Sequence, residues 1–145
     1  MLCRLLRSQE NYSFFCDEAT DGEMVIDRVR QKLEYSIDEK HTKKAVTDIE
    51  LYNATLYDVI IISYEMTKIN GPHVIQKIRF LGYAGLIIGA TDHADDTARE
   101  IFMSNGADIV MVKPLDISVL VEEIVKHMSI TETHKITKNP SLHYL

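Results

Sequence analysis

The amino-acid sequence predicts an α/β domain in which a parallel β-sheet carries helices on both faces. Segments of strand-like composition alternate along the chain with segments whose apolar residues recur at helical spacing. Val59–Ile62 is an unbroken apolar run with three isoleucines, which is typical of a strand buried on both faces. The length of 145 residues fits one domain with a substantial core.

The composition argues against several classes of function. A net charge of −6 and a pI near 5.5 do not fit a protein that binds nucleic acid or membrane surfaces through a basic patch. No apolar run approaches the roughly 18 residues of a membrane span, and the N-terminal segment lacks the features of a signal peptide. Cys3 and Cys16 have no metal-site spacing and the histidines are scattered. We therefore expect a reduced, cytoplasmic setting without a metal or a membrane anchor.

Three elements are expected in the first part of the chain. Met1–Arg7 is a short apolar helical segment, and Ser13–Glu18 suits a strand. A turn at Asp21 and Gly22 separates that strand from the next helix. This helix is expected at Glu23–Leu33, where apolar residues recur on one side.

The chain then alternates strand and helix three times. Strands are expected at residues 58–63, 86–91 and 109–112. Pro72 fits the first turn of the helix after residue 63, because a first-turn amide has no partner to lose. Asn105 and Gly106 favour the left-handed backbone that ends the following helix, and Asp116 can cap the last one.

These elements predict one domain over residues 1–128. Residues 34–56 form a charged insertion, which we interpret as an extension of the second helix and a surface loop. Residues 129–145 have weak periodicity and are expected to form a frayed or loosely packed tail.

Polar residues follow the expected strands in a recognisable order. Ser63 ends the buried strand, Thr91 closes the next one, and Lys113 with Pro114 follows the last. From about residue 3 to residue 128, this arrangement resembles the receiver domain of response regulators, which has a flavodoxin-like fold. Segments 81–96 and 104–116 look especially like the receiver at the C-terminus of eukaryotic hybrid histidine kinases.

The resemblance implies a role for the segment after the buried strand. Ser63 stands where receivers carry the aspartate that accepts a phosphoryl group from a histidine kinase. Met66, Asn70 and Gly71 follow it by three, seven and eight residues, which is the spacing of the receiver loop beside that aspartate.

Further roles are implied for the ends of the next two strands. Thr91 and Lys113 take the positions that contact the phosphoryl group in receivers. Glu65 or Asp92 would be the partner of the lysine, and a cis peptide bond is implied before Pro114.

Departures from the family pattern imply that this chemistry is lost. A serine hydroxyl needs an activating base, and no candidate base stands at matched spacing to Ser63. The first strand of receivers and its two acidic metal ligands have no counterpart here, so Mg²⁺ binding is not expected. Thr67 replaces the loop proline, and Val110 replaces the aromatic switch residue. We expect no catalytic residue, no metal ligand, no cofactor and no enzyme activity.

A parallel sheet without its central first strand would expose two rows of backbone hydrogen-bonding groups. Three outcomes would resolve this. The family's second strand could move beside the third, another chain could supply a strand, or the true start of the protein could lie upstream of Met1.

The predicted function is a degenerate receiver that acts in a phosphorelay by docking. Its partner would be a histidine kinase, a phosphotransfer protein or a parent kinase chain. One alternative is a fragment of a hybrid histidine kinase, or a pseudogene product, without independent function. A second is a small α/β protein that binds a nucleotide or flavin, although the chain lacks a glycine-rich phosphate loop. A third is an active receiver that uses Asp58 or Asp92. Asp58 lies at the wrong end of its strand, and Asp92 lies in a different loop.

Overall fold

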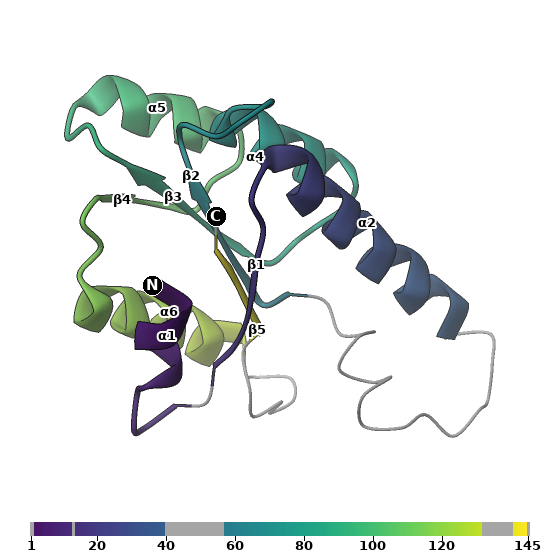
Figure 1. Cartoon of the computed structure of the whole chain (residues 1–145), viewed down its shortest axis with the longest axis horizontal. Helices are drawn as coiled ribbons and strands as arrows, with labels where there is room; N and C mark the ends of the chain where they lie inside the picture. Colours follow the sequence, from purple (N-terminus) through teal and green to yellow (C-terminus); the bar gives the residue numbers. More distant parts are fainter. Residues whose placement is uncertain (1, 13, 40–56, 132–140, 145) are drawn as a thin grey trace.

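A five-stranded sheet with helices on both faces forms the centre of the computed structural model (Figure 1). The structure describes residues 2–12, 14–39, 57–131 and 141–144. The strands are β1 (Phe15–Glu18), β2 (Val59–Ser63), β3 (Leu86–Thr91), β4 (Ile109–Val112) and β5 (Ser141–Tyr144). The helices are α1 (Leu2–Arg7), α2 (Gly22–Glu39), α4 (Gly71–Phe80), α5 (Asp96–Ser104) and α6 (Ile117–Thr131).

All strand pairs described in this sheet are parallel, which confirms the predicted fold class. The spatial order is β1-β5-β2-β3-β4. The predicted strands at 86–91 and 109–112 coincide with β3 and β4, and β2 begins one residue later than predicted. Residue 13, the predicted first residue of β1, lies outside the described residues.

The C-terminal strand β5 corrects two expectations. It lies between β1 and β2, in the place of the first strand that we expected the sheet to lack. Cys16 pairs with Leu142 on one side of it, and Val59 pairs with Leu142 on the other. The tail expected at 129–145 therefore contributes the last turn of α6 and a central strand, while residues 132–140 and 145 lie outside the described residues.

This arrangement differs from two of the outcomes that the sequence suggested for the missing strand, a shifted strand and a strand from another chain. The donors and acceptors of β1 and β2 are paired within the same chain, so neither a shifted strand nor a second chain is needed. A four-residue strand has too few positions to show periodicity, and its partners lie more than 80 residues away in sequence. Composition alone therefore did not predict it.

The connections through α4 and α6 have the same hand. Helix α4 links β2 to β3 across one face, and α6 links β4 back to β5 across the other. The second connection runs along the sheet in the opposite direction to the first, and it crosses the opposite face. These two reversals cancel, so the two crossovers have the same hand. The position of β5 is thus compatible with the right-handed rule that governs such connections.

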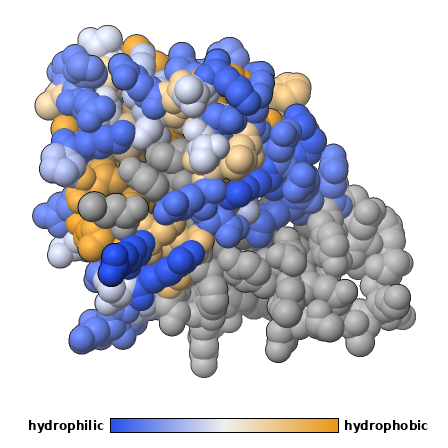
Figure 2. All heavy atoms as spheres, in the orientation of Figure 1, coloured by the Kyte–Doolittle hydropathy of each residue, from blue (hydrophilic) through white to orange (hydrophobic). Residues whose placement is uncertain are grey.

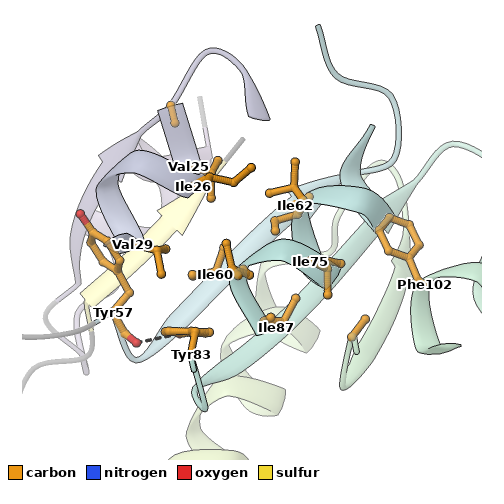
Figure 3. Close-up of a cluster of buried hydrophobic side chains, with 14 residues drawn as sticks. Val25, Ile26, Val29, Tyr57, Ile60, Ile62, Ile75, Tyr83, Ile87 and Phe102 are labelled. Carbon is orange, nitrogen blue, oxygen red and sulfur yellow. Dashed lines mark hydrogen bonds between the residues drawn. The ribbon is translucent and has the colours of Figure 1, made fainter. Parts of the chain in front are cut away.

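Two hydrophobic layers sandwich the sheet, as predicted from the strand composition. One layer contains residues of α1 and α6, including Leu6, Leu120 and Ile124. The other contains residues of α2, α4 and α5, and Figure 3 shows Val29, Ile75 and other side chains of this layer against β2 and β3. Strand β2 is buried along its whole length, which explains its unbroken apolar run.

Tyrosines anchor the amino end of β2. The Tyr83 hydroxyl donates to the carbonyl of Tyr57 at 2.7 Å (Figure 3), and the Tyr57 hydroxyl donates to Asp17 at 3.1 Å. The ammonium of Lys32 lies 4.2 Å from the Tyr57 ring centroid, where cation–π attraction compensates part of its desolvation. Burial lowers the pKa of Lys32, and the charge of nearby Asp17 opposes that shift.

Helix α2 continues past the predicted Leu33 to Glu39, in agreement with the extension expected at the start of the 34–56 insertion. The rest of that insertion, 40–56, lies outside the described residues. Among the described helices, none is both long enough and apolar enough to cross a membrane.

Candidate functional site at the carboxyl edge of the sheet

Ser63, Thr91 and Lys113 lie at the carboxyl ends of three adjacent strands. Ser63 pairs with Ala90, and Thr91 pairs with Val112. The backbone continues this register beyond the strands, because the Lys113 amide donates to the Thr91 carbonyl at 2.7 Å. The structure therefore places the three residues at the same edge of the sheet, where parallel sheets present their binding sites.

The two hydroxyl residues of this edge are buried. Ser63 is 6% exposed and Thr91 is 2% exposed. The Thr91 hydroxyl accepts a hydrogen bond from the His93 amide at 3.1 Å, so it orders the turn after β3. The hydroxyl proton of Thr91 remains a donor in its own right. Thr91 thus stabilises the turn after β3 and also lies at the carboxyl edge of the sheet.

Asn70 and Gly71 shape the loop between β2 and α4. The Asn70 side chain accepts from the His73 amide at 3.0 Å and caps α4. The Gly71 amide donates to the Tyr64 carbonyl at 2.8 Å. A Cβ atom on Gly71 would lie 1.9 Å from the carbonyl oxygen of Ser63, so a glycine is required for this close approach. Met66 is half-buried against the α2–α4 layer.

Gly71→Ala is expected to lower the free energy of unfolding by about 2–3 kcal/mol, because the backbone at Ser63 must shift to admit the methyl group. The exposed Gln76 lies on the same helix, and Gln76→Ala serves as the control, with an expected change within about 0.5 kcal/mol. Urea denaturation measures both. Equal stability of the two variants would show that the loop accommodates a side chain at residue 71.

The same loop is attached to α2 through Lys68. This residue has a φ of +72°, and its ammonium lies 3.2 Å from Asp21 and 3.0 Å from Glu23. The Met24 amide, which donates to Asp21, lowers the pKa of this carboxyl group, and Lys68 adds to the shift. Such exposed ion pairs contribute little stability individually, so their main consequence is to define the position of the loop.

Lys113 and Asp92 line one open cleft of about 520 Å³ beside the sheet edge. The Lys113–Pro114 peptide bond is cis, as expected. The other lining residues are apolar: Leu2, Leu5, Pro114, Leu115 and Ile117. Figure 2 shows apolar side chains gathered on the side of the molecule where β4 leads into α6.

Glu65 lies in a different place from the lysine. It lines a second cleft of about 180 Å³ together with Tyr64, His93 and residues of α5. Two partners were considered for Lys113. Asp92 lines the same cleft as Lys113, whereas Glu65 lines the other cleft. The contribution of α1 to the larger cleft was missed in the sequence, although the apolar character of Met1–Arg7 was a signal.

The strand that replaces the expected first strand carries no acidic residue. Tyr144 is level with Ile61 of β2 and with Glu18 of β1. Residues 141–145 are Ser, Leu, His, Tyr and Leu, which lack the carboxylate oxygens that Mg²⁺ prefers. Within residues 2–12, 14–39, 57–131 and 141–144, no three acidic, histidine or cysteine side chains are grouped as a metal site would require. Strand β5 therefore supplies no acidic side chain at this edge.

Comparison with known proteins gives the family. The model of the response regulator receiver domain matches residues 14–125. The chain belongs to this family. Receiver domains are signalling modules of two-component systems, and the two-component response regulator 24 of Arabidopsis thaliana is 31% identical over 70 residues. That match covers 48% of this chain and 50% of the Arabidopsis protein.

Solved receiver domains share the fold. The signal receiver domain of a Vibrio parahaemolyticus protein has a TM-score of 0.60 at 17% identity and covers 91% of this chain and 82% of its own. A mutant receiver domain of the histidine kinase CKI1 from Arabidopsis thaliana has a TM-score of 0.53 at 20% identity. That match covers 74% of this chain and 70% of the CKI1 chain. At these identities the likeness concerns the fold alone.

Proposed function

We propose that this receiver domain works in a phosphorelay by docking and does not accept an aspartyl phosphate. The observation that carries the proposal is the residue at the phosphoacceptor position. Ser63 ends β2 at the carboxyl edge, level with Ala90 and next to the strand that ends in Thr91. A hydroxyl group at this position is not ionised, so it lacks the nucleophilic character of a carboxylate.

The surroundings of Ser63 support the same conclusion. Phosphotransfer to a receiver needs a divalent cation to neutralise the phosphoryl oxygens. The strand beside β2 supplies His143 and Tyr144 near its carboxyl end, and neither provides a carboxylate. Lys113 and the Thr91 hydroxyl could still contact an anion at this edge, but they would do so without a nucleophile or a metal.

The larger cleft supports docking as the retained activity. Its apolar wall comes from α1 and from the segment after β4, and Asp92 and Lys113 provide charges of both signs. Such a surface fits an amphipathic helix with apolar residues on one face and polar residues beside them. The proposed partner is a helix of a histidine kinase or of a phosphotransfer protein, which would place the chain in the cytoplasm.

Leu5→Asp is expected to weaken binding to a histidine phosphotransfer protein by at least tenfold. Leu5 lines the cleft and is 43% exposed, so a partner would bury apolar area worth about 1.5 kcal/mol or more on this side chain. An Arabidopsis phosphotransfer protein is a suitable probe, and isothermal titration calorimetry gives the affinity.

Phe80→Asp is the matched control. Phe80 is 92% exposed at the end of α4 and is not among the residues that line the cleft, so this variant should bind with unchanged affinity. Circular dichroism verifies that both variants are folded. If the unmodified chain does not bind, or if both variants bind equally well, docking through this cleft is ruled out.

A further inference from the structure

Cys3 and Cys16 are the two cysteines of the chain, and the fold brings their side chains next to each other. Cys3 lies on α1 and Cys16 on β1, and both belong to the same hydrophobic layer. Their exposed fractions are 3% and 4%. Twelve residues lie between them in the sequence, and this spacing gave no signal for a site.

Each thiol is part of the surroundings of the other. The pKa of Cys3 is raised to about 12, mainly by burial and next by the neighbouring Cys16. Burial also raises the pKa of Cys16. The guanidinium of Arg7 donates to the carbonyl of Cys16 at 2.5 Å, so this hydrogen bond holds α1 to β1 at Cys16.

We propose that Cys3 and Cys16 are a redox-modification site, in which a peroxide converts the two thiols into an intramolecular disulfide that ties α1 to β1. The inference rests on the fold and holds whether or not the chain docks to a kinase. The disulfide would also fix one wall of the larger cleft. Leu2 and Leu5 line that cleft and lie on the same short helix as Cys3.

The reaction balances in two steps. One thiolate attacks a peroxide oxygen, which breaks the O–O bond, forms a sulfenic acid and releases hydroxide. The second thiol then attacks the sulfenic sulfur, the S–S bond forms, and the sulfenic oxygen leaves as water. Two thiols are oxidised by two electrons in total, and hydrogen peroxide is reduced to two molecules of water.

Burial sets the conditions of this reaction. The thiolate is the reactive form, and both thiols are protonated at neutral pH. A small peroxide therefore reacts when α1, a six-residue helix, opens locally. The rate is expected to rise about tenfold per pH unit between pH 6 and pH 8, because the thiolate fraction rises by that factor.

Mass spectrometry of the full chain tests the proposal. After treatment with hydrogen peroxide and digestion without reductant, a peptide pair linked through Cys3 and Cys16 is expected in the monomer, and dithiothreitol should release it. Hydrogen exchange adds a second readout, in which the amides of α1 should exchange at least tenfold more slowly in the oxidised chain while those of α5 are unchanged. Cys3→Ala and Cys16→Ala are controls that cannot form the linked pair.

Three results would overturn the proposal. The first is that both thiols remain free in the folded, peroxide-treated chain. The second is that disulfides form mainly between two copies. The third is that each cysteine oxidises separately to sulfinic acid, since a paired thiol should capture the sulfenic acid first.

Discussion

Deletion of residues 141–145 is expected to abolish cooperative folding. Strand β5 pairs with four residues of β1 and three of β2, and these pairs join the two parts of the sheet. At about 0.5–1.5 kcal/mol for each hydrogen bond, and with the unpaired groups left in the centre of the sheet, the loss is about 5 kcal/mol or more. A domain of this size has a total stability of about 5–15 kcal/mol. Thermal and urea denaturation, followed by circular dichroism, measure the effect.

A matched pair of substitutions separates backbone pairing from side-chain effects. His143 pairs with Asp17 on one side and Ile60 on the other. His143→Pro removes the backbone N–H and should destabilise the chain by about 3 kcal/mol or more, whereas His143→Ala retains it and should change stability by less than about 1 kcal/mol. Similar stability of the two variants would contradict a central position for β5.

A cross-link distinguishes pairing within one chain from exchange between copies. Leu142 is the Cα partner of Cys16, and paired strands bring Cα atoms within the range that a disulfide spans. In a Cys3→Ala background, Leu142→Cys should form a disulfide with Cys16 in the monomer. Cross-linked dimers would instead show that β5 comes from a second copy.

The second large effect concerns restored phosphorylation. Ser63→Asp alone is expected to remain unphosphorylated by acetyl phosphate, because the metal still lacks its carboxylate ligands. Tyr144 is level with Ile61 of β2, two positions before Ser63. Leu145→Asp with one further aspartate appended, combined with Ser63→Asp, should therefore assemble a metal site and give a phosphoryl adduct that hydroxylamine removes.

Controls make this result specific. The appended acidic pair without Ser63→Asp should remain inert, and omission of Mg²⁺ should abolish labelling of the combined variant. Efficient phosphorylation of Ser63→Asp alone would mean that other residues, such as Glu65 or Asp92, assemble the metal site.

Most of the sheet could be predicted from the sequence because its signals are local. The apolar run of β2, the cap at Asp116 and the turn at Gly106 each depend on neighbouring residues, and the structure contains all three. The parallel order of β2, β3 and β4 followed from the alternation of strand and helix.

The position of β5 could not be predicted in this way. Its pairing depends on partners distant in sequence, and it uses backbone groups that every residue except proline carries in full. The same holds for the contact between Cys3 and Cys16, since spacing along the chain does not report which core residues meet. The larger cleft also joins segments that are far apart in sequence, α1 and the loop after β4.

Treatment of the unmodified chain with acetyl phosphate and Mg²⁺ tests the central claim most directly, with the Vibrio parahaemolyticus receiver domain that shares its fold as a parallel control. Intact-mass spectrometry before and after hydroxylamine detects an acyl phosphate. We expect no labile phosphoryl adduct on this chain, because Ser63 offers no carboxylate and β5 offers no acidic side chain for Mg²⁺. A stoichiometric, hydroxylamine-labile adduct would contradict the assignment of this chain as a receiver that docks without accepting phosphate.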